Sequence, residues 1–287
     1  IAIAVLSSTL MANPLPNTKK KHPSRPIPAK PCIAAPIISQ DKISAIQKLI
    51  NQYRLQYRIP GISVSFMFPS SHRVLTLTSG LKNIKSKQPI TANTLFQIGS
   101  ITKVYTAILV HQLMSKDKIS LMQPISDWLP QYKKWGHITI KQLLNMHSGI
   151  PGYWENKLFQ AAVEKNPTKA WSSSELLAYV YRAPLLYKPG THFNYSDSNY
   201  IILSMIIEKA SGQSFASLLK QNIINSLKLK HTFYITRSYS KKELNGMATG
   251  YDQANKDIMA INMSQAGAAG AMVAITKDTA LFFNAIF

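Results

Sequence analysis

Residues 95–115, LFQIGSITKVYTAILVHQLMS, constrain the fold of this chain more than any other stretch. After Gly99 and Ser100, apolar side chains occupy almost every side of the expected helix, namely Val104, Ala107, Ile108, Leu109, Val110, Leu113 and Met114. A helix that is apolar all round belongs in the middle of a globular domain. The pattern therefore predicts a buried helix with Ser100 at its solvent-facing start and Lys103 one turn inside.

Ser100 and Lys103 are three residues apart, so their side chains share one face of a helix. A serine hydroxyl is a weak nucleophile until a base takes its proton, and a lysine in a dry environment can act as that base. Free N–H groups at the helix start can also stabilise a developing oxyanion. The alternative is an N-capping serine followed by a lysine that extends to solvent, and the rest of the chain decides between the two.

The composition allows one large domain or two closely packed ones, because the chain has 287 residues of which 46% are hydrophobic. Its 33 Lys and Arg against 12 Asp and Glu give a net charge of +21, which raises the hypothesis of nucleic-acid binding. Charge alone gives only salt-sensitive binding, and the chain has no RNA-recognition, zinc-finger or helix-turn-helix signature. The basic residues are also spread from Lys19 to Lys277. We therefore expect no nucleic-acid partner; contact of the basic surface with anionic envelope polymers is one reading of the charge, and a basic tail at residues 17–38 that only keeps the chain soluble is the alternative.

The first 38 residues read as a leader and a linker. Residues 1–16, IAIAVLSSTLMANPLP, resemble the later part of a secretory signal peptide, with a buried strand or helix as the alternative. Residues 17–38 are rich in proline and lysine and predict an extended linker. No later stretch has the ~18 consecutive apolar residues that a membrane helix needs. We therefore predict an exported protein, periplasmic or extracellular, without stable membrane insertion after signal removal.

From residue 39 on, the spacing of apolar residues divides the chain into an α/β part (39–85), a mostly helical part (86–245) and a return toward the α/β part (246–287). Ser39 is the expected N-cap of a helix that runs to Tyr57, and strands at 62–68 and 74–80 predict a hairpin. Residues 81–99 read as polar and irregular. Further helices are expected at 140–146, after a Ser172–Glu175 capping box, at 198–210 before Gly212, and at 215–227.

The segment PGTHFNYSDSNY, residues 189–200, places Tyr195 just before the helix that starts at Ser198. A tyrosine there can be an ordinary aromatic residue at a pocket rim. A phenol beside a lysine can instead pass protons between Ser100 and a leaving group. His147, in contrast, has no partner at the spacing of a metal site, and we expect it to make a structural hydrogen bond.

Four segments together resemble a known family. They are LFQIGSITK (95–103), LLNMHSG (143–149), PGTHFNYSD (189–197) and AGAMVAITKD (269–278). In this order they resemble the penicillin-recognising serine hydrolases, in particular the branch of class C β-lactamases, D-alanyl-D-alanine carboxypeptidases and esterases. The resemblance implies an α+β fold of the β-lactamase/transpeptidase type. In that fold an antiparallel sheet with flanking helices lies beside an all-helical part, with the pocket between them.

The resemblance also implies roles for four residues. Ser100 is the expected nucleophile, Lys103 assists its deprotonation, and Tyr195 acts as general base and later as general acid. Position 197 matches the asparagine of a Tyr-x-Asn motif that contacts substrate, but here it is Asp197. An ionised Asp only accepts hydrogen bonds and favours a charged Lys103, so the replacement disfavours β-lactam and peptide substrates and leaves ester chemistry open.

The third motif of the family, Lys-Thr-Gly or His-x-Gly, is expected downstream of AGAMV, whereas the chain stops at Phe287 within an apolar run. We therefore expect residues 39–287 to be an incomplete catalytic domain without its C-terminal sheet strands. Since this strand supplies an oxyanion donor, and losing one donor costs ~100- to 1,000-fold in kcat, we predict that the chain as written is inactive.

The predicted function is a serine hydrolase that works through an acyl-enzyme on D-Ala-D-Ala peptides, β-lactams or small esters. Its partner is then a small-molecule or peptidoglycan-derived substrate. The alternative is a catalytically dead relative that binds cell-wall peptide or a protein partner. The sequence has no phosphate-binding glycine loop and no metal-ligand cluster, so no cofactor and no metal are expected.

Overall fold

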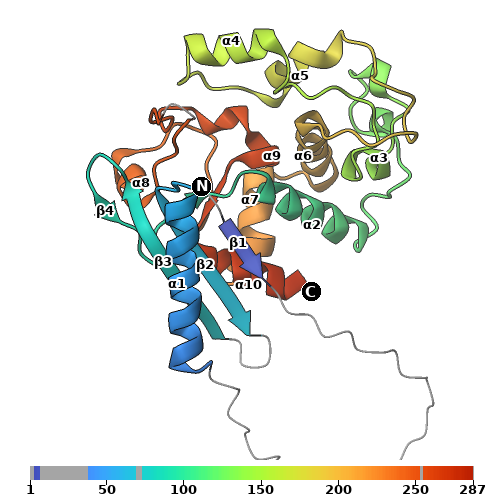
Figure 1. Ribbon diagram of the computed structural model, residues 1–287. Helices are drawn as coiled ribbons and strands as arrows, with labels where there is room; N and C mark the ends of the chain where they lie inside the picture. The colour runs from blue at the N-terminus through green and yellow to red at the C-terminus, as the bar shows by residue number, and fades with distance from the viewer. Residues whose placement is uncertain (1–2, 7–37, 69–72, 253–254, 287) are drawn as a thin grey trace, which may run out of the picture.

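The computed structural model describes residues 3–6, 38–68, 73–252 and 255–286, and these form a helical part beside a smaller sheet part (Figure 1). Residues 17–37 of the predicted linker lie outside the described residues. None of the described helices is long and apolar enough to cross a membrane.

The sheet part is a four-stranded sheet of β1 (Ile3–Leu6), β2 (Gly61–Phe68), β3 (Arg73–Asn83) and β4 (Gln88–Pro89), in that order. The predicted hairpin is confirmed, because β2 and β3 pair antiparallel from Gly61 opposite Gly80 to Phe68 opposite Arg73. β1 pairs parallel with β2. For residues 1–16 the sequence favoured a signal peptide, with a buried strand or helix as the alternative. Export stays a prediction.

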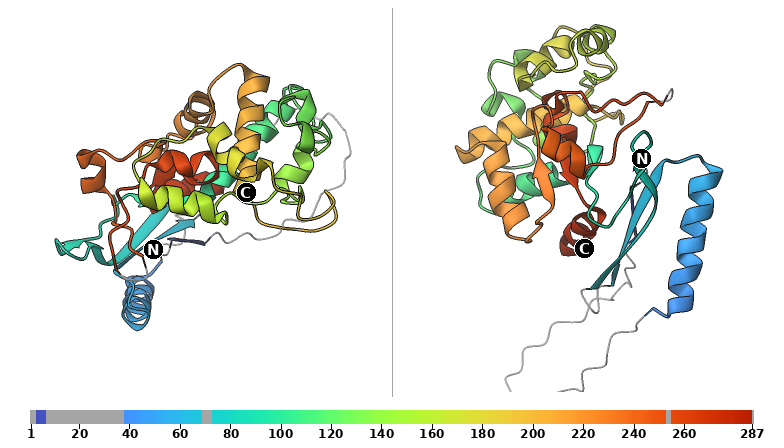
Figure 2. Two further views of the ribbon diagram at one scale, coloured as in Figure 1. Left: turned by 90° about the horizontal axis from the view of Figure 1, so that it is seen from above. Right: turned by 90° about the vertical axis from the view of Figure 1, so that its left-hand side faces the viewer.

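Two helices cover the two faces of this sheet (Figure 2). α1 (Gln40–Gln56) begins at the predicted N-cap Ser39, whose hydroxyl accepts the Lys42 N–H. Because side chains alternate along a strand, Ile62 and Val64 of β2 pack with Ile50 of α1. The intervening Ser63 and Ser65 face the other side, where both contact Thr276 at the start of α10 (Thr276–Ile286).

The helical part contains six α-helices. They are α2 (Thr102–Met114), α3 (Ile140–Leu144), α4 (Lys157–Lys165), α5 (Ser173–Tyr181), α6 (Asp197–Ser211) and α7 (Phe215–Leu219). The capping box of Ser172 and Glu175 is confirmed, and Gly212 ends α6 with φ +71°. The helix expected over 215–227 differs, because α7 continues as a π-helical turn, η4 (Lys220–Asn225). Two 3₁₀ turns, η2 (Ile125–Asp127) and η3 (Lys133–Trp135), lie in the loop after α2.

A second sheet joins distant segments next to the start of α2. Its order is β5 (Phe96–Gln97), β7 (Met272–Ala274) and β6 (Thr232–Tyr234), all antiparallel. α8 (Lys241–Gly246), η5 (Met263–Gln265) and α9 (Gly267–Gly270) complete the return segment. The prediction that 81–99 is irregular was therefore partly wrong, since β3 reaches Asn83 and β4 and β5 follow. Strands of two or three residues are too short to show an alternating pattern.

Candidate active site

Ser100 lies where the buried helix meets solvent. It sits in the 3₁₀ turn η1 (Gly99–Ile101) that leads into α2. Gly99 has φ +51°, a left-handed conformation that glycine adopts without the penalty a side chain brings. Ser100 is exposed, whereas Lys103 is only 6% exposed. The predicted arrangement of an accessible hydroxyl above a buried amine is what the structure shows.

Three of the predicted site residues meet at the Ser100 hydroxyl. Lys103 Nζ lies 3.1 Å from Ser100 Oγ, and Tyr195 Oη lies 2.6 Å from the same oxygen. Tyr195 is 43% exposed, so its ring lines the open side of the cluster. The structure thus brings together a serine hydroxyl and two groups that can exchange protons with it.

Lys103 uses all three of its N–H donors. Besides Ser100 Oγ, its Nζ contacts Asp197 Oδ1 at 2.5 Å and the carbonyl oxygen of Ala269 at 2.9 Å. The Tyr195 ring centroid is 4.8 Å from the same nitrogen, within the range of a cation–π interaction. A carboxylate, a carbonyl and an aromatic face therefore surround the Lys103 amine. In the structure Asp197 is the ion-pair partner of Lys103.

Residues 146–151 hold the start of α6, which carries Asp197. Ser148 Oγ donates to Asn199 Oδ1 at 2.6 Å, and Ser198 Oγ donates to the carbonyl oxygen of Pro151 at 2.7 Å. Asn199 and Ser148 are both buried. Ser148 belongs to the LLNMHSG segment, but its partner could not be identified from the sequence, because the two residues are 51 positions apart.

Two threonines of α2 hold the AGAMV segment against the helix. Thr106 Oγ1 donates to the carbonyl oxygen of Ala268 at 2.8 Å, and Thr102 Oγ1 accepts the Met272 N–H at 3.2 Å. These contacts place the Ala269 carbonyl at Lys103. Thr102 and Thr106 were missed as site residues because a threonine in a helix has no distinctive sequence signal.

The negative charge of Asp197 also acts on the buried phenol of Tyr153. Tyr153 is fully buried, and its hydroxyl donates to the carbonyl oxygen of Gln265 at 2.8 Å. Burial raises the pKa of Tyr153 well above its usual value, and the charge of Asp197 raises it further. Tyr153 therefore remains a neutral hydrogen-bond donor.

His147 lies close to this region without contacting the reacting groups. Its Nδ1 is 2.6 Å from the Asn145 carbonyl oxygen, and its ring packs edge to face with Phe193. The prediction of a structural hydrogen bond agrees with this position. Within the described residues no group of three or more His, Cys, Asp or Glu side chains could hold a metal ion.

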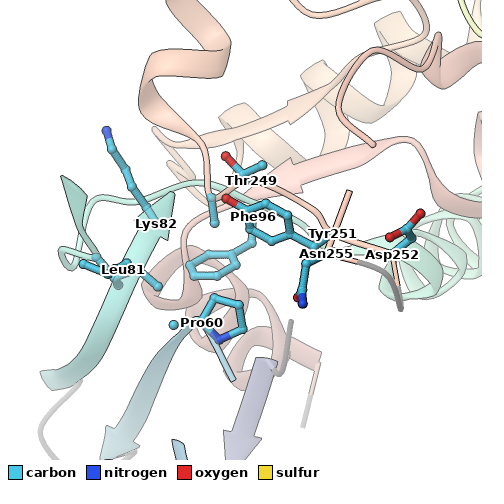
Figure 3. Close-up of a pocket in the computed structure, with 11 residues that line it drawn as sticks. Pro60, Leu81, Lys82, Phe96, Thr249, Tyr251, Asp252 and Asn255 are labelled. Carbon is cyan, nitrogen blue, oxygen red and sulfur yellow. The ribbon is translucent and has the colours of Figure 1, made fainter. Parts of the chain in front are cut away.

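A separate pocket lies between the end of β3 and the segment that includes Ala248, Thr249 and Tyr251 (Figure 3). It encloses about 130 Å³, and Phe96, Lys82 and Tyr251 are among its lining residues. Ser100, Lys103, Tyr195 and Asp197 do not line it. The reactive cluster and this pocket are therefore different places on the molecule.

Known proteins resemble this chain in sequence over most of its length. A β-lactamase of Pseudomonas fluorescens is 30% identical over 205 residues, which cover 71% of this chain and 53% of that protein. Penicillin-binding protein 4* of Bacillus subtilis (strain 168) is 29% identical over 60% of this chain and 38% of its own length. The chain thus spans about half or less of the length of these two relatives.

Solved structures share the fold. The D-amino acid amidase from Ochrobactrum anthropi SV3, in complex with L-phenylalanine, superposes with a TM-score of 0.75 at 28% identity, over 86% of this chain and 70% of that one. A D-stereospecific amidohydrolase from Streptomyces sp. gives 0.74 at 28% identity, over 83% and 71%. These likenesses confirm the predicted α+β, β-lactamase/transpeptidase-like fold.

The family model described as Beta-lactamase matches residues 46–286. This range includes all four segments on which the resemblance rested, as well as Ser100, Lys103, Tyr195 and Asp197. The chain therefore belongs to the Beta-lactamase family of penicillin-recognising serine hydrolases.

Proposed function

We propose that this protein is a serine hydrolase that forms an acyl-enzyme at Ser100. The observation that carries the proposal is the position of Ser100 Oγ, which is within hydrogen-bond distance of both Lys103 Nζ and Tyr195 Oη. Nucleophile and base in direct contact, with a third group that orients the base, are the requirement for activating a serine hydroxyl.

In this geometry Tyr195 is the base and Lys103 is the fixed cation. In the proposed mechanism Tyr195 reacts as its phenolate, beside the Lys103 Nζ that Ser100, Asp197 and Ala269 hold in place. The phenolate takes the Ser100 proton as Oγ bonds to the substrate carbonyl carbon and the carbonyl π electrons move to oxygen. The leaving group then departs with the proton held by Tyr195, which leaves an ester on Ser100.

Hydrolysis of that ester repeats the sequence with water as the nucleophile. Tyr195 takes a proton from the water as its oxygen bonds to the acyl carbon, and returns the proton to Ser100 Oγ as the acyl group leaves. The products are a carboxylic acid and free enzyme. Backbone N–H groups at the start of α2 are suited to stabilise the oxyanion formed in both halves.

The proposed substrates are D-Ala-D-Ala peptides, β-lactams or small esters and amides. The names of the relatives support this range, since they include a β-lactamase and a teichoic acid D-alanine hydrolase of Staphylococcus aureus. Export to the periplasm or the exterior, and contact of the basic surface with anionic envelope polymers, are parts of the same proposal. The net charge of +21 supports the second part.

Covalent labelling tests the proposal directly. A fluorophosphonate probe should add one adduct to the protein, located on Ser100 by peptide mass spectrometry, and a fluorescent penicillin should label the same residue less completely, because Asp197 disfavours β-lactams. Ser100→Ala should take no label from either probe while keeping the circular dichroism spectrum of the parent. A folded protein that neither probe modifies would refute the acyl-enzyme proposal.

A second candidate function is a relative that binds cell-wall peptide without cleaving it. The carboxylate of Asp197 favours this candidate, because it contacts Lys103 at the position where the family motif has an asparagine and, when ionised, can only accept hydrogen bonds from a substrate. Retention of muropeptides by a protein that takes no label at Ser100 would support it. Labelling of Ser100 would decide for the enzyme.

A further inference from the structure

A second tyrosine lies against the amine that contacts Ser100. The ring centroid of Tyr200 is 5.8 Å from Lys103 Nζ, and the ring centroid of Tyr195 is 4.8 Å from the same nitrogen. An ammonium group within about 6 Å of a tyrosine ring is attracted by the negative face of that ring. The Lys103 amine therefore has two aromatic faces beside it in addition to its three oxygen partners.

The two tyrosines differ in exposure and in what their hydroxyl groups do. Tyr195 is 43% exposed, and its Oη lies 2.6 Å from Ser100 Oγ. Tyr200 is only 7% exposed, and its hydroxyl donates to the carbonyl oxygen of Leu144 at 3.2 Å. Burial is the main cause that raises the pKa of Tyr200, and the nearby Tyr195 raises it further. Tyr200 therefore remains a neutral hydrogen-bond donor and is unsuited to proton transfer.

Hydrogen bonds to the LLNMHSG segment fix the Tyr200 ring. Leu144 is the last residue of α3, and Tyr200 lies in the first turn of α6. The preceding residue of α6, Asn199, accepts a hydrogen bond from Ser148 at 2.6 Å. Two neighbouring residues of α6 are thus bonded to the same short segment. Because Ser148, Asn199 and Tyr200 are all buried, the ring has little freedom to turn.

We propose that Tyr200 is a positioning residue of the Ser100 site, whose buried ring face holds the Lys103 amine in place beside the Ser100 hydroxyl. This inference rests on the proposed function, since it concerns the groups that activate the serine. Tyr200 acts through Lys103 and does not touch the substrate. A lysine side chain is a flexible four-carbon stem with a point charge at its end, so a ring face against that end restricts where the amine can go.

The other groups around the amine do not all stay the same during the proposed reaction. Ser100 Oγ bonds to the substrate, and Tyr195 takes up and releases a proton. The carboxylate of Asp197, the carbonyl of Ala269 and the ring of Tyr200 keep one chemical form throughout. Of these three, Tyr200 supplies an aromatic face, and its attraction for the amine is strongest while the amine carries a proton.

Replacement of the ring tests the proposal. Tyr200→Leu keeps an apolar side chain but removes the ring face, whereas Tyr200→Phe keeps the ring and removes only the hydroxyl. The rate constant for fluorophosphonate labelling of Ser100 should fall by roughly fivefold to thirtyfold in Tyr200→Leu, the range of a cation–π interaction away from solvent. Tyr200→Phe should recover most of that loss. Equal rates in Tyr200→Leu and the parent would overturn the inference.

Tyr132→Leu is the matched control for the loss of a buried tyrosine ring. Tyr132 is 7% exposed, like Tyr200, and its ring packs on Trp135 and Tyr181. Thermal unfolding gives the folded fraction of each variant, and labelling is measured at a temperature at which all are folded. The control should lose stability and keep its labelling rate. If it slows labelling as much as Tyr200→Leu does, the effect is one of packing and the inference is overturned.

Fluorinated phenylalanines at position 200 test the ring face even if Tyr200→Leu does not fold. Fluorine atoms on the ring weaken its negative face while its shape stays nearly the same, so a residue that only fills space would be unaffected. Relative to Tyr200→Phe, the labelling rate should fall with each added fluorine while the unfolding temperature stays nearly constant. A rate that does not depend on the number of fluorine atoms would overturn the inference.

The same assay separates this inference from the proposed function. Absence of fluorophosphonate labelling in the parent protein would refute the acyl-enzyme proposal itself. Labelling of Ser100 in the parent, with no response to fluorination at position 200, would refute only the role of Tyr200.

Discussion

The helical part and the sheet part of the molecule differ in how completely they bury their apolar residues. In the helical part Trp135, Phe159 and Leu203 are fully buried in one continuous core. The sheet part has a small cluster of Ile50, Ile62, Val64 and Leu77, each 7 to 9% exposed. α1 also leaves several large apolar side chains half exposed or more, namely Leu49, Tyr53, Leu55 and Tyr57.

The reactive cluster belongs to the better-packed side. Ser100 and Lys103 lie at the start of α2, Tyr195 and Asp197 lie at the start of α6, and Ala269 lies in α9. α2, α6 and α9 pack on one another. Since interior packing at this density fixes side-chain positions, the geometry of the cluster depends chiefly on the helical core. α10 packs on β2 and β3 of the sheet part, and its Phe282 stacks on Tyr105 of α2.

The largest effect is expected from breaking the ion pair inside the helical part. Lys103→Met leaves the Asp197 carboxylate, 13% exposed, without its cation. Loss of one partner of a buried pair costs ~3–5 kcal/mol of unfolding free energy, measurable by urea denaturation. Lys103→Met combined with Asp197→Leu should recover most of that loss. A single variant as stable as the parent would show that water already solvates this pair.

Truncation of a core leucine should distinguish the two parts of the molecule. Leu203→Ala in α6 removes a fully buried side chain and should lower the unfolding free energy by ~2–5 kcal/mol. Leu55→Ala in α1 removes a side chain that is 66% exposed and should change it by less than about 0.5 kcal/mol. Similar costs at the two positions in thermal or urea unfolding would show that α1 is as well covered as α6.

A hydroxyl cluster joins the sheet to α10. Thr276 Oγ1 lies 2.9 Å from Ser63 Oγ and 2.8 Å from Ser65 Oγ, and all three residues are buried. Thr276→Val removes the hydroxyl partner of Ser63 and one of the two of Ser65, which keeps Thr76 Oγ1, so stability should fall by ~1–3 kcal/mol. The control is Thr168→Val, at an exposed position, which should be near neutral in the same chemical denaturation series. A neutral Thr276→Val would mean that the two parts are held together elsewhere.

The smallest effect is expected from a surface ion pair outside both cores. Glu243 accepts two hydrogen bonds from Arg237, and these are the main cause that lowers the pKa of Glu243 from about 4.5 to about 2. A carboxyl group whose pKa is lower in the folded protein than in the unfolded chain stabilises the fold at pH values above its ordinary pKa. This contribution is lost as the pH falls from about 4.5 through about 2. Because Arg237 is 60% exposed, we expect at most about 1 kcal/mol.

Glu243→Gln tests this contribution and keeps the capping box with Ser240. The stability difference between parent and variant should be present at pH 6 and should shrink toward zero as the pH approaches 2, measured by thermal unfolding across that range. A difference that grows on acidification would have the wrong sign for a depressed carboxyl pKa.

The sequence by itself determined the elements whose cause is local. The buried helix after Ser100, the N-cap at Ser39, the capping box at Ser172 and the glycine that ends α6 each depend on residues within one or two turns. The spacing of three residues between Ser100 and Lys103 also predicted their contact, because an i, i+3 pair is fixed by helix geometry.

Only the tertiary structure decided how distant segments meet. Tyr195 and Asp197 reach the Ser100–Lys103 pair across more than 90 positions, and the Ala269 carbonyl reaches it across 166. The three-residue strands β6 and β7 and the partners of Thr102 and Ser148 were equally invisible in the sequence. Such contacts are selected by the packing of α2 against α6 and α9, which no local pattern of side chains specifies.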